Sequence, residues 1–229
     1  MTGNRLGKAL RLLQLHDPFD EVPEVTVACT DALEMEGLAV SLISGGVDIE
    51  LLWCTDETTR QFEDLQFTLG QGPGPDTVRT GRMESVPDWA QVHPGRWPGL
   101  TTEVMGLKAR AVFCFPLAIG AVHLGVLTAV RRTPGPLTGR QVYNASILAA
   151  ALTAQYLNSG EAQLTYLALG RVLLRRRLIH QASGVVSAQL DIPAPQALLR
   201  LRTFAYSSGR SVTDVCQDVV DHRLSLDGA

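Results

Sequence analysis

Cysteine is scarce in this sequence: four residues among 229, and no two of them form a C-x-x-C pair. This scarcity argues against the disulfide framework of a small secreted domain and against a Cys/His zinc site. Residues 6–15 are interrupted by charges, so they lack the apolar run of a signal peptide. We therefore predict reduced, buried thiols in a cytoplasmic protein that holds no metal.

The motifs of the common catalytic sites are also missing. There is no G-x-S-x-G, no H-E-x-x-H and no second His/Asp site to accompany His16 and Asp17. The glycine-rich segment 70–74 lacks a following Lys-Ser/Thr, and its two prolines cannot donate backbone hydrogen bonds, so we predict a structural turn there. His123 is flanked by strand-forming residues and is expected to be structural. These features predict a protein that is not an enzyme and needs no cofactor.

One stretch lacks charge altogether. Residues 111–130 contain no Asp, Glu, Lys or Arg, and twenty such residues would be long enough to cross a membrane. The stretch is rich in β-branched and aromatic residues, however, and is interrupted by Pro116 and Gly120. We therefore predict two buried strands joined near Gly120, and no membrane contact.

Net charge is only −3, but the charges are unevenly distributed. Residues 160–215 hold seven arginines against three acidic residues, whereas residues 1–159 hold twelve basic against seventeen acidic residues. A basic block after an acidic first part indicates two modules with different partners. Charge alone leaves open whether the basic block binds RNA, binds DNA as a helix-turn-helix, or is simply a solvated face.

The first module is predicted to extend over residues 1–158 and to have an α+β fold with an antiparallel sheet flanked by helices. Asp56 precedes a run with acidic residues in its first turn, which is typical of a helix N-cap. The expected helices are residues 5–15, 22–35, 56–67, 100–107 and 141–157, and the expected strands are 37–44, 49–55, 83–86 and the two halves of 111–131.

The second module, residues 159–229, is predicted to contain three helices, at about 161–190, 195–206 and 211–224. The first is expected to continue from the helix at 141–157 and so to connect the modules. Its heptad pattern predicts a homodimer through this connecting helix. The heptad positions are Leu164, Leu167, Arg171, Leu174, Leu178, Gln181, Val185 and Ala188.

Five arginines of this module are candidate RNA ligands, because guanidinium groups suit both phosphate contact and stacking on unpaired bases. Arg176 and Arg177 lie on the first expected helix, Arg200 and Arg202 on the second, and Arg210 at the turn into the third.

Residues 176–224 resemble an ANTAR domain, a three-helix module that binds tandem RNA stem-loops and prevents transcription termination. The resemblance implies that Arg176, Arg202 and Arg210 are the first arginines to test, followed by the other two. The family favours Lys where Ser183 stands and Ala where Cys216 stands, so one expected basic contact is missing. The positions that match are Arg176, Ile179, Gln181, Ala182, Gly184, Ala197, Leu201, Arg202, Ala205, Arg210, Ser211, Val212, Asp214, Val215, Val219 and Val220.

Residues 20–157 are similar to the GAF-like sensor domain that precedes ANTAR in actinobacterial regulators. The similarity lies in TLGQGPGPDTVRTGR (68–82), PDW (87–89), RWPG (96–99) and the apolar run at 109–127. It implies a small-molecule ligand of unspecified type. The family often has Cys where Gly74 stands, so a thiol-based sensing role is not implied for this loop.

Together these resemblances imply a signal-responsive antiterminator that binds stem-loops in nascent mRNA. The alternative is a small-molecule-binding dimeric signalling module that acts through a protein partner or DNA, its helical tail serving as a coupling stalk.

Overall fold

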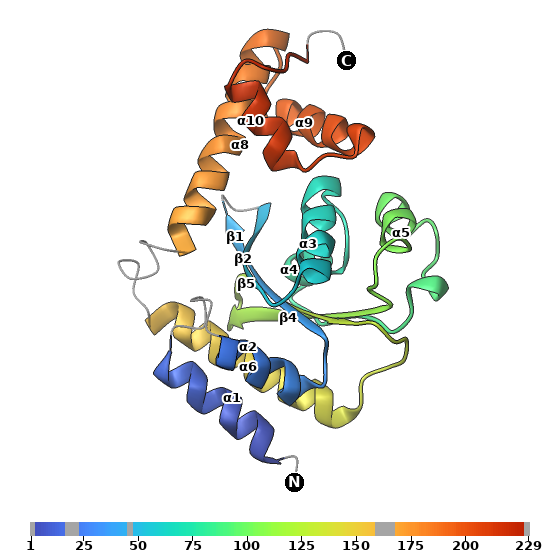
Figure 1. The fold of residues 1–229 in the computed structure, drawn as a ribbon, viewed down its shortest axis with the longest axis vertical. Coiled ribbons are helices and arrows are strands. Elements are labelled where there is room, and N and C mark those ends of the chain that lie inside the picture. Colours follow the sequence, from blue (N-terminus) through green and yellow to red (C-terminus); the bar gives the residue numbers. More distant parts are fainter. Residues whose placement is uncertain (1–2, 17–22, 45–47, 159–167, 227–229) are drawn as a thin grey trace. The chain divides into compact units, whose positions relative to one another are not determined.

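The computed structural model describes residues 3–16, 23–44, 48–158 and 168–226, and the chain divides into two compact units, Met1–Ala168 and Leu169–Ala229 (Figure 1). The predicted module boundary after residue 158 and the predicted passage of one helix through residues 159–167 lie outside the described residues.

The described residues of the first unit form a five-stranded antiparallel sheet in the order β2-β1-β5-β4-β3. The charge-free stretch is its central hairpin, as predicted, and Gly120 lies in the turn with φ 57°. The strands are β1 (Gly37–Ser44), β2 (Asp48–Cys54), β3 (Glu84–Val86), β4 (Ala111–Ile119) and β5 (Val122–Arg131).

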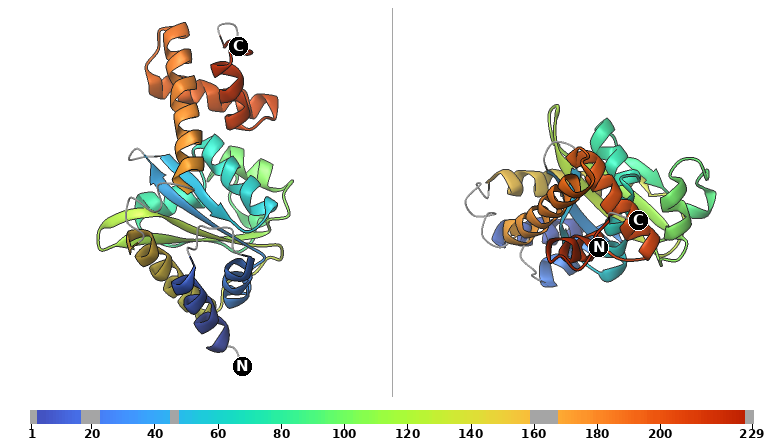
Figure 2. Two further views of the ribbon diagram at one scale, coloured as in Figure 1. Left: turned by 60° about the vertical axis from the view of Figure 1, so that its left-hand side comes forward. Right: turned by 90° about the horizontal axis from the view of Figure 1, so that it is seen from above.

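Helices cover both faces of this sheet. The helices α1 (Gly3–Leu15), α2 (Pro23–Leu33) and α6 (Gly139–Asn158) lie on one face (Figures 1 and 2). The opposite face is covered by α3 (Glu57–Leu69), α4 (Pro73–Thr80) and α5 (Pro98–Val104), with a short 3-10 turn at Trp89–Gln91. Because both faces are covered, consecutive residues of β4 from Ala111 to Phe115 are all buried.

Local chemistry sets the ends of α3 and α4. Asp56 caps α3 as predicted, since its side chain accepts a hydrogen bond from the Thr59 amide at 3.1 Å. Gly70 ends α3 in the left-handed conformation, and Pro73 opens α4 at a position where a missing N–H costs nothing. The glycine-rich segment is therefore a helix-to-helix turn, as predicted.

The second unit contains α8 (Ala168–Leu190), α9 (Ala194–Ser208) and α10 (Val212–Val220). Figures 1 and 2 show α9 and α10 beside the C-terminal half of α8. Gly209 ends α9 at φ 63°, and Ser211 caps α10 by accepting from the Asp214 amide at 3.0 Å. The predicted end of the last helix near residue 224 is wrong: the helix stops at Val220, because His222 adopts φ 56°.

Within the part of the chain that the structure describes, no helix is long and apolar enough to cross a membrane.

Candidate functional site

The core of the second unit is a small apolar cluster contributed by all three helices. On α9 the buried side chains Ala197, Leu201 and Ala205 follow each other at four-residue steps and form a single stripe. The other buried side chains of the unit are Ile179, Ala182, Ser183 and Val186 of α8, Val212, Val215, Cys216 and Val219 of α10, and Leu226. Cys216 is therefore a core residue, and the alanine that the family favours at this position would also be buried.

The heptad positions Leu164, Leu167, Arg171 and Leu174 lie outside the side chains that the structure describes, and the four described positions do not face the core of this unit. Of these four, Leu178 and Val185 are only half-buried, and Gln181 and Ala188 are exposed. Among the described side chains of α8, from residue 177 onward, the buried face is a different one, formed by the residues between 179 and 186 given above. The heptad face consequently remains a prediction for contact with a second copy.

The candidate arginines of α9 point to different sides of the helix, while the side chain of Arg176 lies outside the described part of the structure. Arg176 and Arg177 both lie on α8, where the Arg177 side chain is exposed. On α9, Arg200 and Arg202 flank the buried Leu201 and are therefore about 200° apart around the helix axis. Arg200 is exposed, whereas Arg202 is half-buried.

Arg210 is engaged within its own unit. Its guanidinium forms an ion pair with Asp218 of α10, and Asp218 also accepts from Arg223 at 2.8 Å. These hydrogen bonds, first from Arg210 and then from Arg223, lower the pKa of the Asp218 carboxyl. Arg210 therefore ties the α9–α10 turn to α10, a role that its position in the sequence did not indicate.

Charge is segregated among the three helices. The sequences of α8 and α9 contain six arginines and no acidic residue, whereas α10 contains Asp214 and Asp218 and no basic residue. A polyanion is accordingly attracted to α8 and α9 and repelled by α10.

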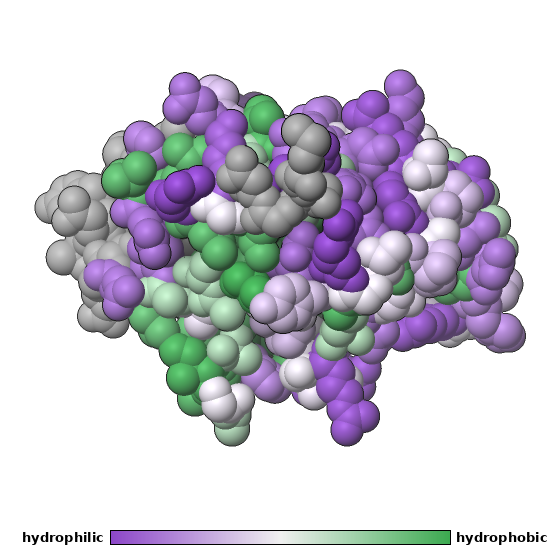
Figure 3. All heavy atoms as spheres, turned by 90° about the horizontal axis from the view of Figure 1, so that it is seen from below, coloured by the Kyte–Doolittle hydropathy of each residue, from purple (hydrophilic) through white to green (hydrophobic). Residues whose placement is uncertain are grey.

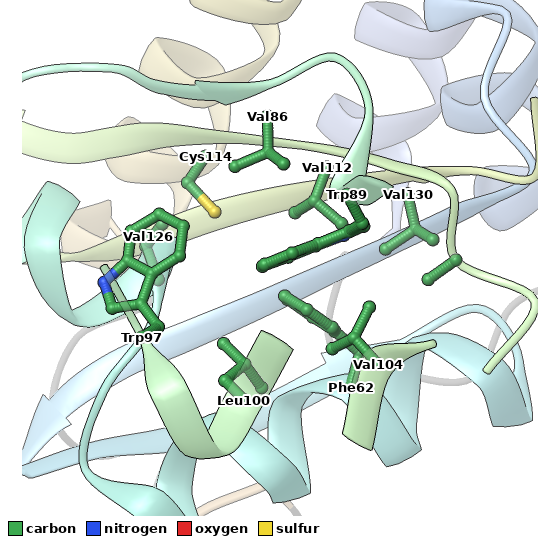
Figure 4. Close-up of a cluster of buried hydrophobic side chains, with 11 residues drawn as sticks. Phe62, Val86, Trp89, Trp97, Leu100, Val104, Val112, Cys114, Val126 and Val130 are labelled. Atoms are coloured by element: carbon green, nitrogen blue, oxygen red, sulfur yellow. The ribbon is translucent and has the colours of Figure 1, made fainter. Parts of the chain in front are cut away.

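The first unit holds an aromatic cluster between the sheet and helices α3 and α5 (Figure 4). The ring centroids of Phe62 and Trp89 are 5.8 Å apart, as are those of Trp89 and Trp97. The indole N–H of Trp97 donates to the Asp76 carboxylate at 3.2 Å, and the Arg96 guanidinium lies 4.2 Å from the Trp97 ring centroid. The buried indole nitrogen of Trp89, in contrast, has no hydrogen-bond partner among the described residues.

A buried polar cluster lies on the same side of the sheet. The Glu63 carboxyl of α3 accepts from the Ser41 hydroxyl at 2.8 Å and from the Gln66 amide at 3.1 Å. Burial raises the pKa of Glu63, although hydrogen bonds from Thr128, Ser41 and Gln66 oppose this. Gln66 in turn accepts from the Gly74 amide at 2.8 Å.

Sequence reasoning on the helix at 56–67 was limited to its N-cap and its acidic first turn, so this polar cluster was not predicted. A usable signal was present: Thr59, Phe62, Glu63 and Gln66 recur at helical spacing, and all are buried.

The remaining predictions concern His123 of this unit and the four cysteines of the whole chain. His123 is structural, as predicted, with its Nδ1 donating to the Val78 carbonyl at 2.8 Å. All four cysteines are free, and three of them are buried, as predicted; Cys54 is half-exposed. Burial raises the pKa of Cys29 to about 12 and, together with nearby acidic groups led by Asp56, that of Cys54 to about 11. In the part of the chain described, no group of three or more His, Cys, Asp or Glu side chains could hold a metal ion.

Comparison with known proteins supports this division. The model of the ANTAR domain family matches residues 168–220, and no curated protein matches the sequence. Among solved structures, the GAF domain of a phosphoenolpyruvate-protein phosphotransferase from Coxiella burnetii is 15% identical with a TM-score of 0.56, covering 69% of this chain and 94% of that one. A GAF domain of the same kind of protein from Acinetobacter is 11% identical with a TM-score of 0.56, covering 71% and 96%. A free methionine-R-sulfoxide reductase from Neisseria meningitidis is 15% identical with a TM-score of 0.54, covering 70% and 91%.

The chain thus joins an α+β domain to a three-helix domain. Specifically, residues 168–220 match the ANTAR domain family, and the first unit has a GAF-like fold. ANTAR domains are RNA-binding antiterminator modules, and GAF domains sense small molecules.

Proposed function

We propose that this protein is a signal-responsive regulator that binds tandem stem-loops in nascent mRNA and prevents transcription termination. The main support is the ANTAR match at residues 168–220, where the sequences of α8 and α9 contain six arginines and no acidic residue. Each arginine that contacts a phosphate adds salt-dependent affinity for RNA. Cytoplasmic location, where nascent mRNA is accessible in bacteria, is part of this proposal.

The input is proposed to be a small molecule that acts on the first unit. The aromatic and polar clusters between the sheet and helices α3 to α5 support a binding site for this molecule on that side of the sheet. They provide planar apolar surface together with buried polar groups of Glu63 and Gln66, the mixture typical of small-molecule sites.

We propose a homodimer as the working form, and α6 supports it in addition to the heptad face of α8. Among its nineteen residues after Gly139, only Arg140 is charged. Its solvent-facing stripe carries the exposed side chains of Tyr143 and Leu157, at 63% and 46% exposure, with Ala150 and Ala154 between them. Hydrophobic surface is gathered on one half of the face seen in Figure 3, from the side of α1, α2 and α6. A second copy would cover such a surface.

We also propose that the chain is not an enzyme. The thiols of Cys29 and Cys54 have raised pKa values, and burial raises the pKa of Cys114 as well, which keeps the reactive thiolate scarce.

The test begins with in vitro selection. The full-length protein is incubated with RNAs that carry two fixed stems and randomised loops, and bound RNA is amplified and measured by fluorescence anisotropy. We expect enrichment of particular loops, competition by the same RNA but not by duplex DNA, and increased readthrough of a terminator that overlaps the selected stem-loops.

A double variant, Arg177→Ala with Arg200→Ala, is expected to bind more weakly and to lower the salt slope by roughly one unit for each phosphate that is no longer bound. Arg79→Ala is the matched control, since Arg79 is 74% exposed but lies in the first unit. Absence of RNA enrichment at low salt would overturn the proposed function, and stronger competition by duplex DNA would favour a DNA-binding regulator.

A further inference from the structure

The outward face of α9 combines exposed apolar side chains with a positive charge. Leu199 is 63% exposed and Tyr206 is 42% exposed, unusual values for large apolar residues in so small a unit. They are seven residues apart, so with the exposed Thr203 they form one stripe along the helix. Arg200, also exposed, lies next to Leu199 at the edge of this stripe.

This stripe is opposite to the core-facing side of α9. Ala197, Leu201 and Ala205 are completely buried, so the helix cannot rotate to bury Tyr206 without exposing them. Tyr206 lies in the last helical turn, where the left-handed Gly209 donates its amide to the Tyr206 carbonyl at 3.2 Å. The tyrosine is therefore presented from a fixed backbone, and it has only two side-chain torsions to order on binding.

Charge indicates which kind of partner fits this face. No acidic residue occurs in α9. Among the described acidic residues of the unit, Asp191 precedes α9, and the others are on or next to α10, where Arg210 and Arg223 pair with Asp218. An RNA that approaches the Leu199–Tyr206 stripe meets arginine and an aromatic ring, and no carboxylate on the same helix. Unpaired bases of RNA loops stack on aromatic side chains, whereas paired bases in an RNA stem offer no free faces.

We infer that the face of α9 formed by Leu199, Arg200, Thr203 and Tyr206 is an RNA-loop contact surface, in which Tyr206 stacks on an unpaired base and Arg200 contacts the neighbouring phosphate. This inference rests on the proposed function and identifies where the loop is read. It assigns loop reading to Tyr206, a residue outside the five arginines expected from the sequence.

The experiment uses the full-length protein and the selected tandem stem-loop RNA, prepared also with abasic nucleotides at the unpaired loop positions. Tyr206→Ala is expected to weaken binding of the intact RNA by about ten-fold or more, the effect of removing one base stack. Its affinity for the abasic RNA should equal that of the wild type. Tyr206→Phe keeps the ring and should bind within about two-fold of wild type, because stacking needs no hydroxyl.

Two controls separate stacking from other effects. Val122→Ala shortens an exposed apolar side chain of β5, outside the proposed dimer and RNA surfaces, and should leave RNA affinity unchanged. Arg200→Ala should lower the salt slope by about one unit, whereas Tyr206→Ala should leave the slope unchanged. Far-UV circular dichroism of each variant checks that the helices are retained.

Equal affinity of Tyr206→Ala and wild type for the intact RNA would overturn the inference while leaving the proposed function in place. Equal losses in Tyr206→Ala and Tyr206→Phe would overturn stacking. A change of mass in light scattering for Tyr206→Ala without RNA would show that the face contacts another copy of the chain instead. Failure of the wild type to select any RNA would refute the proposed function itself.

Discussion

Trp89 and Trp97 allow a paired test of the packing in the first unit, because they belong to one cluster and differ in hydrogen bonding. Both side chains are at most 3% exposed. Trp97 donates its indole N–H to Asp76 at 3.2 Å, whereas the Trp89 nitrogen is buried without a hydrogen-bond partner among the described residues. Replacing either tryptophan with Phe removes a similar volume. At Trp97 the replacement removes a hydrogen bond, whereas at Trp89 it removes a buried N–H group that has no partner among the described residues.

Both variants lose buried apolar surface, and the area lost gives the destabilisation that they share. Trp→Phe loses on the order of 50 Å² of buried surface, or about 1 kcal/mol at about 25 cal/mol/Å². At Trp97 the loss of the hydrogen bond to a carboxylate adds about 1 kcal/mol, less than the about 1.5 to 3 kcal/mol usual for a charged acceptor, because the Asp76 side chain is 21% exposed and keeps Arg79 at 2.8 Å. At Trp89 the variant removes a buried unsatisfied donor, which returns about 1 to 3 kcal/mol.

We therefore expect Trp97→Phe to lower the free energy of unfolding by about 2 kcal/mol, and Trp89→Phe to leave it unchanged or raise it by up to about 2 kcal/mol. The assay is urea unfolding of the full-length protein followed by tryptophan fluorescence. All three tryptophans (Trp53, Trp89 and Trp97) lie in the first unit, so the signal reports that unit alone.

Circular dichroism recorded in parallel tests whether the two units unfold together, which decides whether a two-state fit applies. If Trp89→Phe costs as much as Trp97→Phe at equal m-values, the hydrogen-bond reasoning is refuted.

Three further substitutions test other parts of the structure. Glu63→Gln should flatten the pH dependence of the free energy of unfolding. In the wild type, the raised pKa of Glu63 stabilises the folded state below the ordinary value of 4.5, and this stability is lost as pH rises through the folded-state pKa. The urea midpoints at pH 5 and pH 8 should therefore lie closer together in the variant than in the wild type. Ser211→Ala removes the α10 cap and should lower amide-exchange protection of its first turn about five-fold, equivalent to about 1 kcal/mol; unchanged protection at the Asp214 amide would contradict the cap. Gly125→Ala would place a Cβ 2.1 Å from the Ser41 carbonyl oxygen, so β1 and β5 must separate; we expect a loss of at least about 2 kcal/mol in the fluorescence assay, and a smaller loss would show that the strands adjust readily.

Much of the local structure could be predicted from the sequence, because its signals are carried by neighbouring residues. The cap at Asp56, the turn at Gly120 and the helix end at Gly209 each depend on the conformational preference of a few consecutive residues. The α+β class and the antiparallel sheet followed from the order of these elements, and the ANTAR resemblance carried the prediction of RNA binding.

Tertiary structure decided which side chains are available for function. Arg210 matched a family position, yet it pairs with Asp218, eight residues further along the chain, and no spacing rule predicts that contact. The buried face of α8 differs from its heptad face because α9 and α10, not a second helix in register, set the core of the unit. The inward direction of Glu63 and the outward direction of Tyr206 likewise depend on what packs against each helix. Composition alone cannot determine this, since every helix has several faces and the neighbouring elements select which one is buried.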